Sequence, residues 1–468
     1  MSDSKTLLKN TLIYTAGNFG AKILSFLLIP LYSYFLTKSQ LGMYDLIITS
    51  VQLLLPVVSL QMNEAVYRWL LDCGDDINLK RKVLKQSAFI MGCTFVVVQV
   101  LILIVRQYHE IPHIKEFSFL IFTSSILPFL QQITRGVGKT KLYSLAGILN
   151  SIFIFGITIL FLYMPWFEDK VQGIFYSLII ANVLTSLFLF VSSNIYFRGF
   201  FETELDFELQ KSLIRYSLPL VLNTLSWWVI NASDRYIILE FLNIEDNGIY
   251  AISTRLPSLL TIINTVFMLA WQDLVISDKN DKNPIYSKVF NNYISFNLTL
   301  TLILIAANPL ICHVLFDINF FESWKYAPFL YLGSCFSSLS GFLGAIYLKS
   351  KQTKGILITS AIAALINIII SAGLINLIGL HACVLGTFFS FLTMFIIRYK
   401  QTVKVIQLNL NVKNIVGQTF LVLFFTGILL YFESLICSAL LTFFAITFFY
   451  IINKTSLKTI FTKILNTR

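Results

Sequence analysis

The sequence predicts an all-α membrane protein that crosses the bilayer about fourteen times, because its hydrophobic runs are about 20 residues long. Of its 468 residues, 56% are hydrophobic and only 13% are charged, whereas a soluble domain carries about 25% charged residues. The runs are continuous, while strands of a membrane barrel would be about ten residues long and would alternate in polarity. We therefore expect helices that use lipid as their solvent.

The hydrophobic runs give the expected transmembrane helices in order. They lie at residues 10–36, 41–70, 86–105, 117–135, 142–164, 171–197, 212–242, 248–277, 289–312, 326–348, 355–375, 379–397, 415–432 and 435–452. Each can span about 30 Å at about 1.5 Å per residue. The first run is too long for the apolar part of a cleavable signal peptide. The loops between the runs hold no room for a soluble catalytic domain, so we do not expect an enzyme.

Basic residues predict the orientation. With the N-terminus in the cytoplasm, the inner loops collect most of the Lys and Arg residues, such as Lys80 and Arg81. The outer loops hold Lys38, Arg106, Lys115, Lys170 and Lys325. An excess of basic residues in short cytoplasmic loops is the usual orientation signal, and it places both termini in the cytoplasm. These loops also account for the formal net charge of +11, so we do not expect nucleic-acid binding.

The chain contains a weak internal repeat. Residues 10–44 align with residues 216–250 without a gap, and Gly42-Met43-Tyr44 matches Gly248-Ile249-Tyr250. The copies begin six predicted helices apart, so both enter the membrane with the same topology. Parallel repeats of this kind are typical of transporters, whose substrate site lies between two lobes. We expect two six-helix lobes at residues 1–211 and 212–400, then two additional helices and a basic tail at residues 401–468.

Charged side chains within the predicted spans are the first candidates for a site, since each costs about 2.5–3.5 kcal/mol on insertion scales. They gather on the first, second, seventh and eighth helices. The basic residues are Lys22, Arg68, Arg235 and Arg255, and the nearby acids are Glu64 and Asp234. This basic excess predicts a cationic, hydrated cavity for an anion. In the alternative structural interpretation, Arg68 extends to the interface, Asp234 pairs with Arg235, and Glu64 pairs with Arg68 one turn away.

Several motifs do not carry chemistry. Gly138-Lys139-Thr140 resembles the end of a phosphate-binding loop, but Ile133 stands where that pattern requires glycine. His109 and His113 lie in a short outer loop without a metal-binding pattern. The six cysteines are scattered and form no C-x-x-C motif. We therefore expect neither a nucleotide cofactor nor a metal ion.

Four segments carry a resemblance to a known family. They are Asn18 to Tyr44, Ser217-Leu218-Pro219 through Ser233-Asp234-Arg235-Tyr236, Gly248-Ile249-Tyr250, and Lys351 to Lys354. In these segments, and more loosely over nearly the whole chain, the sequence resembles the Wzx-type polysaccharide-unit flippases of the multidrug/oligosaccharidyl-lipid/polysaccharide exporter superfamily. One departure is His381-Ala382 after Gly379, where relatives often have a second small residue. It concerns local helix packing only.

The resemblance implies a fold and a function. The fold is two six-helix lobes followed by two extra helices. The function is transfer of undecaprenyl-diphosphate-linked oligosaccharide repeat units from the cytoplasmic to the periplasmic leaflet of the bacterial inner membrane. These units would supply O-antigen (lipopolysaccharide), capsule or exopolysaccharide assembly. A polysaccharide polymerase and a chain-length regulator are the partners that such a pathway implies.

This substrate fits the predicted cavity. Basic side chains would bind the diphosphate while the lipid tail stays among membrane lipids. The sugars would contact Asn18, Trp227, Trp228, Asn231 and Trp271. One lobe would rock against the other in alternating access. A membrane potential, worth about 2.3 kcal/mol per charge per 100 mV, would favour outward movement of the anion without ATP. Coupling to H⁺ or Na⁺ through Glu64 or Asp234 is a further expectation.

Three other functions fit parts of the sequence. A flippase for a peptidoglycan lipid precursor would share the same features. A small-molecule or drug antiporter of the same superfamily would need an acidic cavity for organic cations, contrary to the basic excess. A membrane polysaccharide polymerase would need a sizeable outer loop with catalytic groups, and no predicted outer loop is that long.

Overall fold

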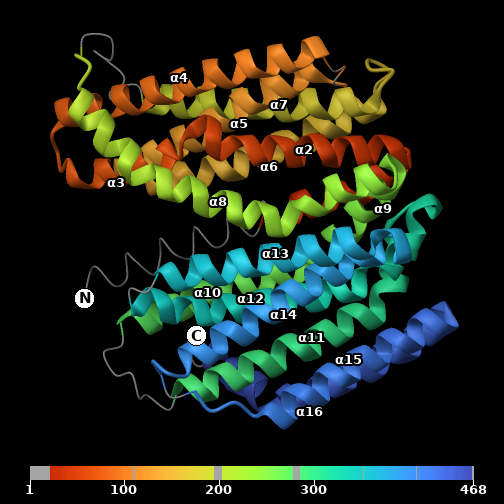
Figure 1. The fold of residues 1–468 in the computed structure, drawn as a ribbon. Helices are drawn as coiled ribbons and strands as arrows, with labels where there is room; N and C mark the ends of the chain where they lie inside the picture. The colour runs from red at the N-terminus through yellow and green to blue at the C-terminus, as the bar shows by residue number, and fades with distance from the viewer. Residues whose placement is uncertain are drawn as a thin grey trace. The chain divides into compact units, whose positions relative to one another are not determined.

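The computed structural model describes residues 20, 22–108, 110, 112–193, 203–277, 285–350, 353–406 and 408–465, and Figure 1 shows their arrangement. Within these residues the secondary structure is helical and no strand occurs. The predicted all-α class is therefore confirmed. Alternating polarity, the signature of strands, is absent from the sequence, and continuous apolar runs satisfy their backbone hydrogen bonds only as helices in lipid.

The helices follow the predicted hydrophobic runs. In chain order they are a short apolar helix at Lys22–Phe35, α2 (Lys38–Ser59), α3 (Met62–Asp72), α4 (Ile77–Tyr108), α5 (Ile114–Gly136), α6 (Thr140–Tyr163), α7 (Lys170–Ser192), α8 (Phe207–Phe241), α9 (Ile244–Arg255), α10 (Ser258–Ser277), α11 (Ile285–Leu315), the 3-10 helix η2 (Ile318–Lys325), α12 (Ala327–Lys349), α13 (Thr353–Ile378), α14 (His381–Thr402), α15 (Val412–Phe432) and α16 (Leu435–Leu465).

Eleven of the described helices are long and apolar enough to cross a membrane, and the Lys22–Phe35 helix is a shorter apolar one. Every predicted run contains helical residues, but α8 and α10 are not among the eleven. The number fourteen and the cytoplasmic position of both termini stay predictions.

The described residues pack as two units. The first comprises the residues up to Leu36 together with Tyr44–Trp228, and the second comprises Thr37–Met43 and the residues from Val229 onward. The chain therefore changes unit three times: between Leu36 and Thr37 just before α2, inside α2, and inside α8. The predicted lobe boundary between residues 211 and 212 lies in the first turns of α8, and the predicted lobes stay a description of the sequence repeat.

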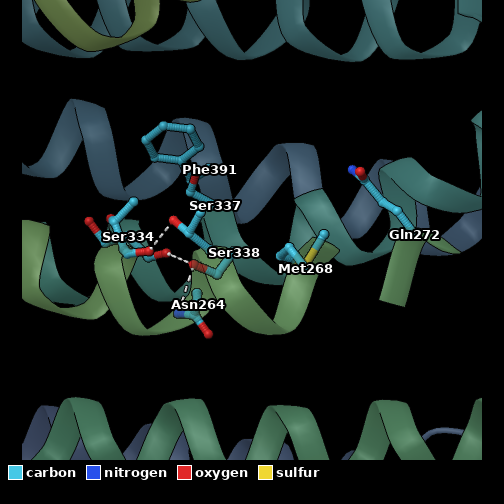
Figure 2. A pocket seen from close by; sticks show the side chains of 9 residues that line it. Asn264, Met268, Gln272, Ser334, Ser337, Ser338 and Phe391 are labelled. Carbon is cyan, nitrogen blue, oxygen red and sulfur yellow. Dashed lines mark hydrogen bonds between the residues drawn. The ribbon is translucent and has the colours of Figure 1, made fainter. Parts of the chain in front are cut away.

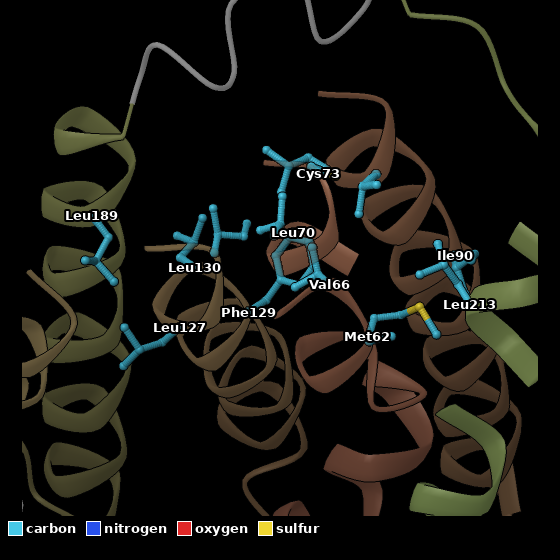
Figure 3. Close-up of a cluster of buried hydrophobic side chains, with 14 of the residues drawn as sticks. Met62, Val66, Leu70, Cys73, Ile90, Leu127, Phe129, Leu130, Leu189 and Leu213 are labelled. Atoms are coloured by element: carbon cyan, nitrogen blue, oxygen red, sulfur yellow. The ribbon is translucent and has the colours of Figure 1, made fainter. Parts of the chain in front are cut away.

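A hydrophobic cluster joins the helices of the first unit. Its buried members come from α3 to α8, and include Met62, Leu70, Ile133, Leu189 and Leu213 (Figure 3). The other faces of these helices are apolar as well. Val96 and Val97 of α4, for example, are each 59% exposed. An apolar exposed face of this kind suits contact with acyl chains rather than water.

The second predicted helix is broken in two. Between α2 and α3, Leu60 and Gln61 adopt left-handed backbone angles, with φ of 43° and 53°, which cost non-glycine residues roughly 1–2 kcal/mol each. Neighbouring side chains compensate at the break, as membrane helices require. The Thr94 hydroxyl donates to the Val58 carbonyl (2.5 Å), and Gln61 Nε2 donates to Thr224 Oγ1 of α8 (3.1 Å).

The start of α8 is tied to the start of α4. Gln86, fully buried on α4, donates from Nε2 to the Glu204 carbonyl (2.9 Å) and accepts from the Asp206 backbone (3.1 Å). Lys82 forms an ion pair with Asp206 (2.6 Å), and this hydrogen bond lowers the pKa of the Asp206 carboxyl. The segment that leads into α8 is thereby held against the first unit.

In the second unit, α12, α13 and α14 pack together, and α15 and α16 pack against α11 (Figure 1). Buried residues of α8, α9, α12, α13 and α14 form its hydrophobic cluster, with Ile238 and Tyr250 among them. Ser438 of α16 donates to the Ala306 carbonyl of α11 (2.6 Å). The two additional helices predicted after the second lobe are thus present.

The two Gly-x-Tyr copies of the sequence repeat meet in the second unit. A Cβ atom on Gly42 would collide with the carbonyl oxygen of Ile244, and one on Gly248 would collide with the carbonyl oxygen of Lys38. The contacts are reciprocal, because each partner stands four residues before the other glycine. Asn247 Nδ2 also donates to the Gly42 carbonyl (2.8 Å). Only glycine permits so close an approach of two helix backbones.

Alanine at either glycine should therefore be poorly tolerated. We expect Gly42→Ala and Gly248→Ala to lower the free energy of unfolding by about 1–3 kcal/mol or more, since a rigid backbone rather than a flexible side chain would have to move. The measurement is thermal unfolding of the purified protein in detergent. Gly156→Ala on α6 is the matched control, because its Cβ would enter open space. Unchanged unfolding of both contact variants would contradict the packing.

Candidate functional site

Asp234 is the most deeply buried of the predicted charged residues. It lies on α8 in the second unit, and only 1% of it is exposed. An isolated carboxylate in such a place would be very costly, so it requires partners. The structure supplies them from three other helices.

Three hydroxyl groups donate to the Asp234 carboxylate. The Tyr250 hydroxyl of α9 donates to Oδ2 (2.6 Å), Ser371 Oγ of α13 donates to Oδ1 (3.0 Å), and Thr387 Oγ1 of α14 donates to Oδ2 (3.0 Å). Hydrogen bonds to a charged acceptor are about twice as strong as neutral ones. The carboxylate therefore links α8 to α9, α13 and α14.

Asn367 of α13 completes the set. With its amide nitrogen directed at α8, it donates to Ser233 Oγ (3.1 Å) and to Asp234 Oδ1 (3.2 Å), and its oxygen accepts from Thr387. This orientation is the one that satisfies the hydrogen-bond network. We call Asp234, Tyr250, Asn367, Ser371 and Thr387 the Asp234 cluster.

Arg235 is the only cation that we find directly beside the Asp234 cluster among the described contacts. It is 7% exposed, its guanidinium carbon lies 5.1 Å from the centre of the Tyr250 ring, and Nη2 donates to Thr254 Oγ1 (3.1 Å). The predicted pairing of Asp234 with Arg235 stays a prediction, while Tyr250 contacts both residues. A buried cation near a buried carboxylate lowers the cost of both charges.

A close helix contact makes the Asp234 cluster possible. A Cβ atom on Gly386 of α14 would collide with Ser371 Oγ and would lie 3.0 Å from the Asn367 carbonyl oxygen. Glycine at this position lets α13 and α14 approach until Thr387, the next residue, reaches Asp234. The approach thereby fixes the spacing of the oxygen atoms in the cluster.

The chemistry of the Asp234 cluster is that of an oxygen-rich, singly charged site. Carboxylate oxygens are ligands preferred by hard cations, and the hydroxyl groups beside Asp234 could turn their oxygen lone pairs to a bound cation. The carboxylate can also take up a proton, and its hydroxyl neighbours can then reorient to accept from it. Both properties fit exchange of a small cation.

The predicted acid of the first unit has a simpler environment. Glu64 lies in the first turn of α3 and accepts one hydrogen bond from Gln132 Nε2 (3.0 Å). At a helix N-terminus its charge complements the helix dipole. Arg68 pairs with Asp72 (2.6 Å), so the expected pairing of Glu64 with Arg68 is wrong. The reason is that Asp72 lies one turn further along the same helix, where both side chains are well exposed.

The two remaining basic candidates, Lys22 and Arg255, lie in different units. Lys22 is exposed on the short Lys22–Phe35 helix of the first unit, and Arg255 is partly buried at the last position of α9 in the second unit. As a base at a helix C-terminus, Arg255 complements the dipole of α9. Their role in binding an anion stays a prediction.

The aromatic and amide candidates differ in exposure. Trp227 and Trp228 of α8 are partly buried, and the Trp228 indole donates to the Thr49 carbonyl (2.9 Å). Trp271 of α10 is 3% exposed, and its indole donates to the Phe342 carbonyl (2.9 Å). Asn18 lies outside the described residues, as does the side chain of Asn231. Contacts of these residues with sugars stay predictions.

The second unit also contains a polar pocket of about 380 Å³ (Figure 2). Three helices, α10, α12 and α14, supply its lining. The lining residues are Thr261, Asn264, Thr265, Met268, Gln272, Ser334, Ser337, Ser338 and Phe391. None of them is charged.

Charge patterns in the sequence do not identify most residues of the Asp234 cluster or of the pocket, because most of these residues are uncharged. Asn367 and Ser371 stand one helical turn apart in an otherwise apolar run, as do Ser334 and Ser338. Polar residues at that spacing on a membrane helix share one face, and that signal would have found them. The sequence marks Tyr250 only as the last residue of the Gly248-Ile249-Tyr250 repeat motif, and not as a partner of Asp234.

Comparison with known proteins places the chain in a family. The family model described as "Polysaccharide biosynthesis protein" matches residues 7–272. The chain belongs to this family. No curated protein sequence matches it significantly.

Solved structures share the fold of this polysaccharide biosynthesis family member. The lipid II flippase MurJ in an inward closed conformation matches with a TM-score of 0.69 at 14% sequence identity, over 95% of this chain and 100% of that one. An inward-facing multidrug resistance MATE family transporter of the MOP superfamily matches with a TM-score of 0.66 at 15% identity, over 84% and 95%. The chain therefore shares the fold of these two proteins, and it is a multi-pass protein of the bacterial cytoplasmic membrane, as predicted.

The Asp234 cluster should stabilise the second unit measurably. Removing the Tyr250 hydroxyl leaves a buried carboxylate short of one donor, which costs about 1.5–3 kcal/mol for a bond to a charged group. We expect Tyr250→Phe to lower the unfolding temperature in detergent. Tyr450→Phe on α16, where the side chain is 57% exposed, should leave it unchanged. Equal unfolding temperatures for the two variants would show that the Tyr250 hydrogen bond does not stabilise the fold.

Proposed function

We propose that this protein is a flippase that moves undecaprenyl-diphosphate-linked oligosaccharide units from the cytoplasmic to the periplasmic leaflet. The observation that carries the proposal is a match to a polysaccharide biosynthesis family on a chain that has the fold of a lipid II flippase and of multidrug transporters. A membrane transporter contributes to polysaccharide synthesis by carrying its lipid-linked intermediates. The units would supply O-antigen, capsule or exopolysaccharide assembly.

Alternating access is the mechanism that we propose. The chain changes unit inside α2 and inside α8, so two continuous helices connect the units. Small changes in the bend of these helices would alter how the units face each other, while each unit keeps its own packed interior. Lys22, Arg68, Arg235 and Arg255 would attract the diphosphate, as the sequence predicts, and the lipid tail would remain in the bilayer.

Deletion of the gene tests the function. We expect lipid-linked oligosaccharide to accumulate in the cytoplasmic leaflet, where a glycosidase or lectin added to spheroplasts does not reach it, and surface polysaccharide to disappear. Accumulation of unpolymerised units in the periplasmic leaflet would instead indicate a polymerase. Arrest of cell-wall synthesis with accumulated peptidoglycan precursor would indicate a flippase for that lipid.

The basic residues are tested in the same cells. Lys22→Ala and Arg255→Ala should abolish surface polysaccharide at normal protein levels, because each removes a cation from the proposed anion path. Lys115→Ala and Arg106→Ala, which change exposed residues at helix ends, are the matched controls and should retain full display. Full display in both test variants would contradict the cationic cavity.

We also propose that Asp234, rather than Glu64, carries the coupling cation, H⁺ or Na⁺. Two observations support this choice. Asp234 is 1% exposed and is surrounded by four oxygen-bearing side chains from three helices, whereas Glu64 has one amide partner and complements a helix dipole. A cation or proton bound at Asp234 would change the net charge in the interior of the second unit, and with it the packing of α8, α13 and α14.

Ion gradients across proteoliposomes test the coupling. We expect transport by the wild type to rise severalfold with an imposed gradient of either Na⁺ or H⁺. Asp234→Asn should abolish this dependence, because the amide neither protonates nor attracts a cation. Glu64→Gln is the matched control and should retain it. If Glu64→Gln loses the dependence and Asp234→Asn keeps it, the coupling site lies on α3 instead.

A further inference from the structure

The polar pocket of the second unit differs chemically from every other candidate site. Its nine lining residues comprise five hydroxyl side chains, two amides, Met268 and Phe391. Among the residues that the structure describes, no carboxylate or basic group lines it. Its volume of about 380 Å³ lies within the range of about 300–1,000 Å³ that is typical of small-molecule sites.

The pocket residues have unused hydrogen-bonding capacity. The side chains of Thr261, Gln272, Ser334 and Ser337 make no hydrogen bond to any other described residue. Asn264 is 3% exposed, and although its amide nitrogen donates to Asn297 (2.6 Å) and Ser338 (3.1 Å), its side-chain oxygen has no partner in the described part of the chain. Buried polar atoms are normally paired, so the Asn264 oxygen points to a ligand, and the partly exposed side chains of Gln272 and Ser337 are available to the same ligand.

The pocket exposes more apolar than polar surface, but its hydroxyl and amide groups would be left unpaired against lipid. Acyl chains offer no hydrogen bonds, and unpaired hydroxyls and amides against them would be costly. Thr261 is exposed at its rim, so the pocket opens at the surface of the second unit. A polar pocket within apolar helices is expected to face a hydrated space.

The ligand is therefore a neutral, polar group with many hydroxyls. The described lining offers no cation that would neutralise a phosphate and no acid that would bind an organic cation. Amides and hydroxyls both donate and accept, as sugar hydroxyls do. Phe391 and Met268 give an apolar surface for the C–H face of a sugar ring. We infer that this pocket binds an uncharged sugar of the transported oligosaccharide and makes the protein selective for it.

This inference rests on the proposed function and divides the substrate between two kinds of site. The diphosphate goes to the basic residues, and a neutral sugar goes to the pocket of α10, α12 and α14. Sites that hydrogen-bond a ligand's hydroxyls discriminate strongly against ligands that lack them, because their polar groups are then left unpaired. The pocket would thus set which units are exported.

A binding experiment tests the inference. The probes are lipid-linked oligosaccharide extracted from the deletion strain and undecaprenyl diphosphate without sugar. The test protein is the triple variant Thr261→Val, Gln272→Met, Ser337→Ala in nanodiscs, in which no internal hydrogen bond of the described structure is removed. Thr447→Val, an exposed position on α16, is the matched control. Affinities are measured by microscale thermophoresis, and unfolding temperatures check the fold.

The wild type and the control should bind the oligosaccharide-linked lipid more tightly than undecaprenyl diphosphate. Each lost hydrogen bond to a neutral partner should weaken binding about two- to tenfold. The triple variant should therefore lose about tenfold or more for the oligosaccharide-linked lipid and nothing for undecaprenyl diphosphate.

Three results would overturn the inference. Wild-type affinity of the triple variant for the oligosaccharide-linked lipid would exclude the pocket. Equal affinity of the wild type for the two lipids would mean that sugar is not recognised, while export of a lipid diphosphate would still stand. If the wild type binds neither lipid, the proposed function fails and the sugar assignment fails with it.

Discussion

The apolar solvent is the constraint on which the rest of this structure depends. In hydrocarbon there is no water to satisfy a polar group, so backbone amides bond within their own helices and buried polar side chains bond to neighbouring ones. Arg398 of α14 is an example. It is 2% exposed and donates to the Ser340 carbonyl (3.0 Å), Thr359 Oγ1 (3.0 Å) and Ser360 Oγ (3.1 Å). Polar residues therefore mark the places where helices of a unit are locked together.

Glycine decides how closely those helices approach. Gly42 and Gly248 bring α2 and α9 into backbone contact, and Gly386 does the same for α13 and α14. In the second case the close approach also builds a site, since Thr387 reaches Asp234 because the preceding residue, Gly386, lacks a side chain. The glycine at position 386 thus accounts both for the close packing of α13 and α14 and for the hydrogen bond from Thr387 to Asp234. Membrane helices in general rely on small residues for such contacts, because lipid gives no hydrophobic force between them.

Charged and neutral chemistry occupy different places in the second unit. The Asp234 cluster combines one carboxylate with hydroxyls of α9, α13 and α14, whereas the pocket between α10, α12 and α14 has hydroxyls and amides without charge. A cation and a neutral sugar would therefore not compete for the same groups. Because α14 contributes to both, its position is the physical link through which the state of one would affect the other.

The sequence by itself determined the all-helical membrane fold, the order of the helices and the repeated Gly-x-Tyr motif, because hydropathy and helix length act locally along the chain. It also identified Asp234 as an unusual buried charge. It did not reveal the break between α2 and α3 at Leu60–Gln61 or the break between α9 and α10 at Leu256–Pro257. Nor did it reveal the Arg68–Asp72 pair or the partners of Asp234. Ser371 and Thr387 lie 137 and 153 residues from Asp234. Only the tertiary structure decided which of many polar residues meet, because hydrogen bonds depend on distances between helices that no local pattern contains.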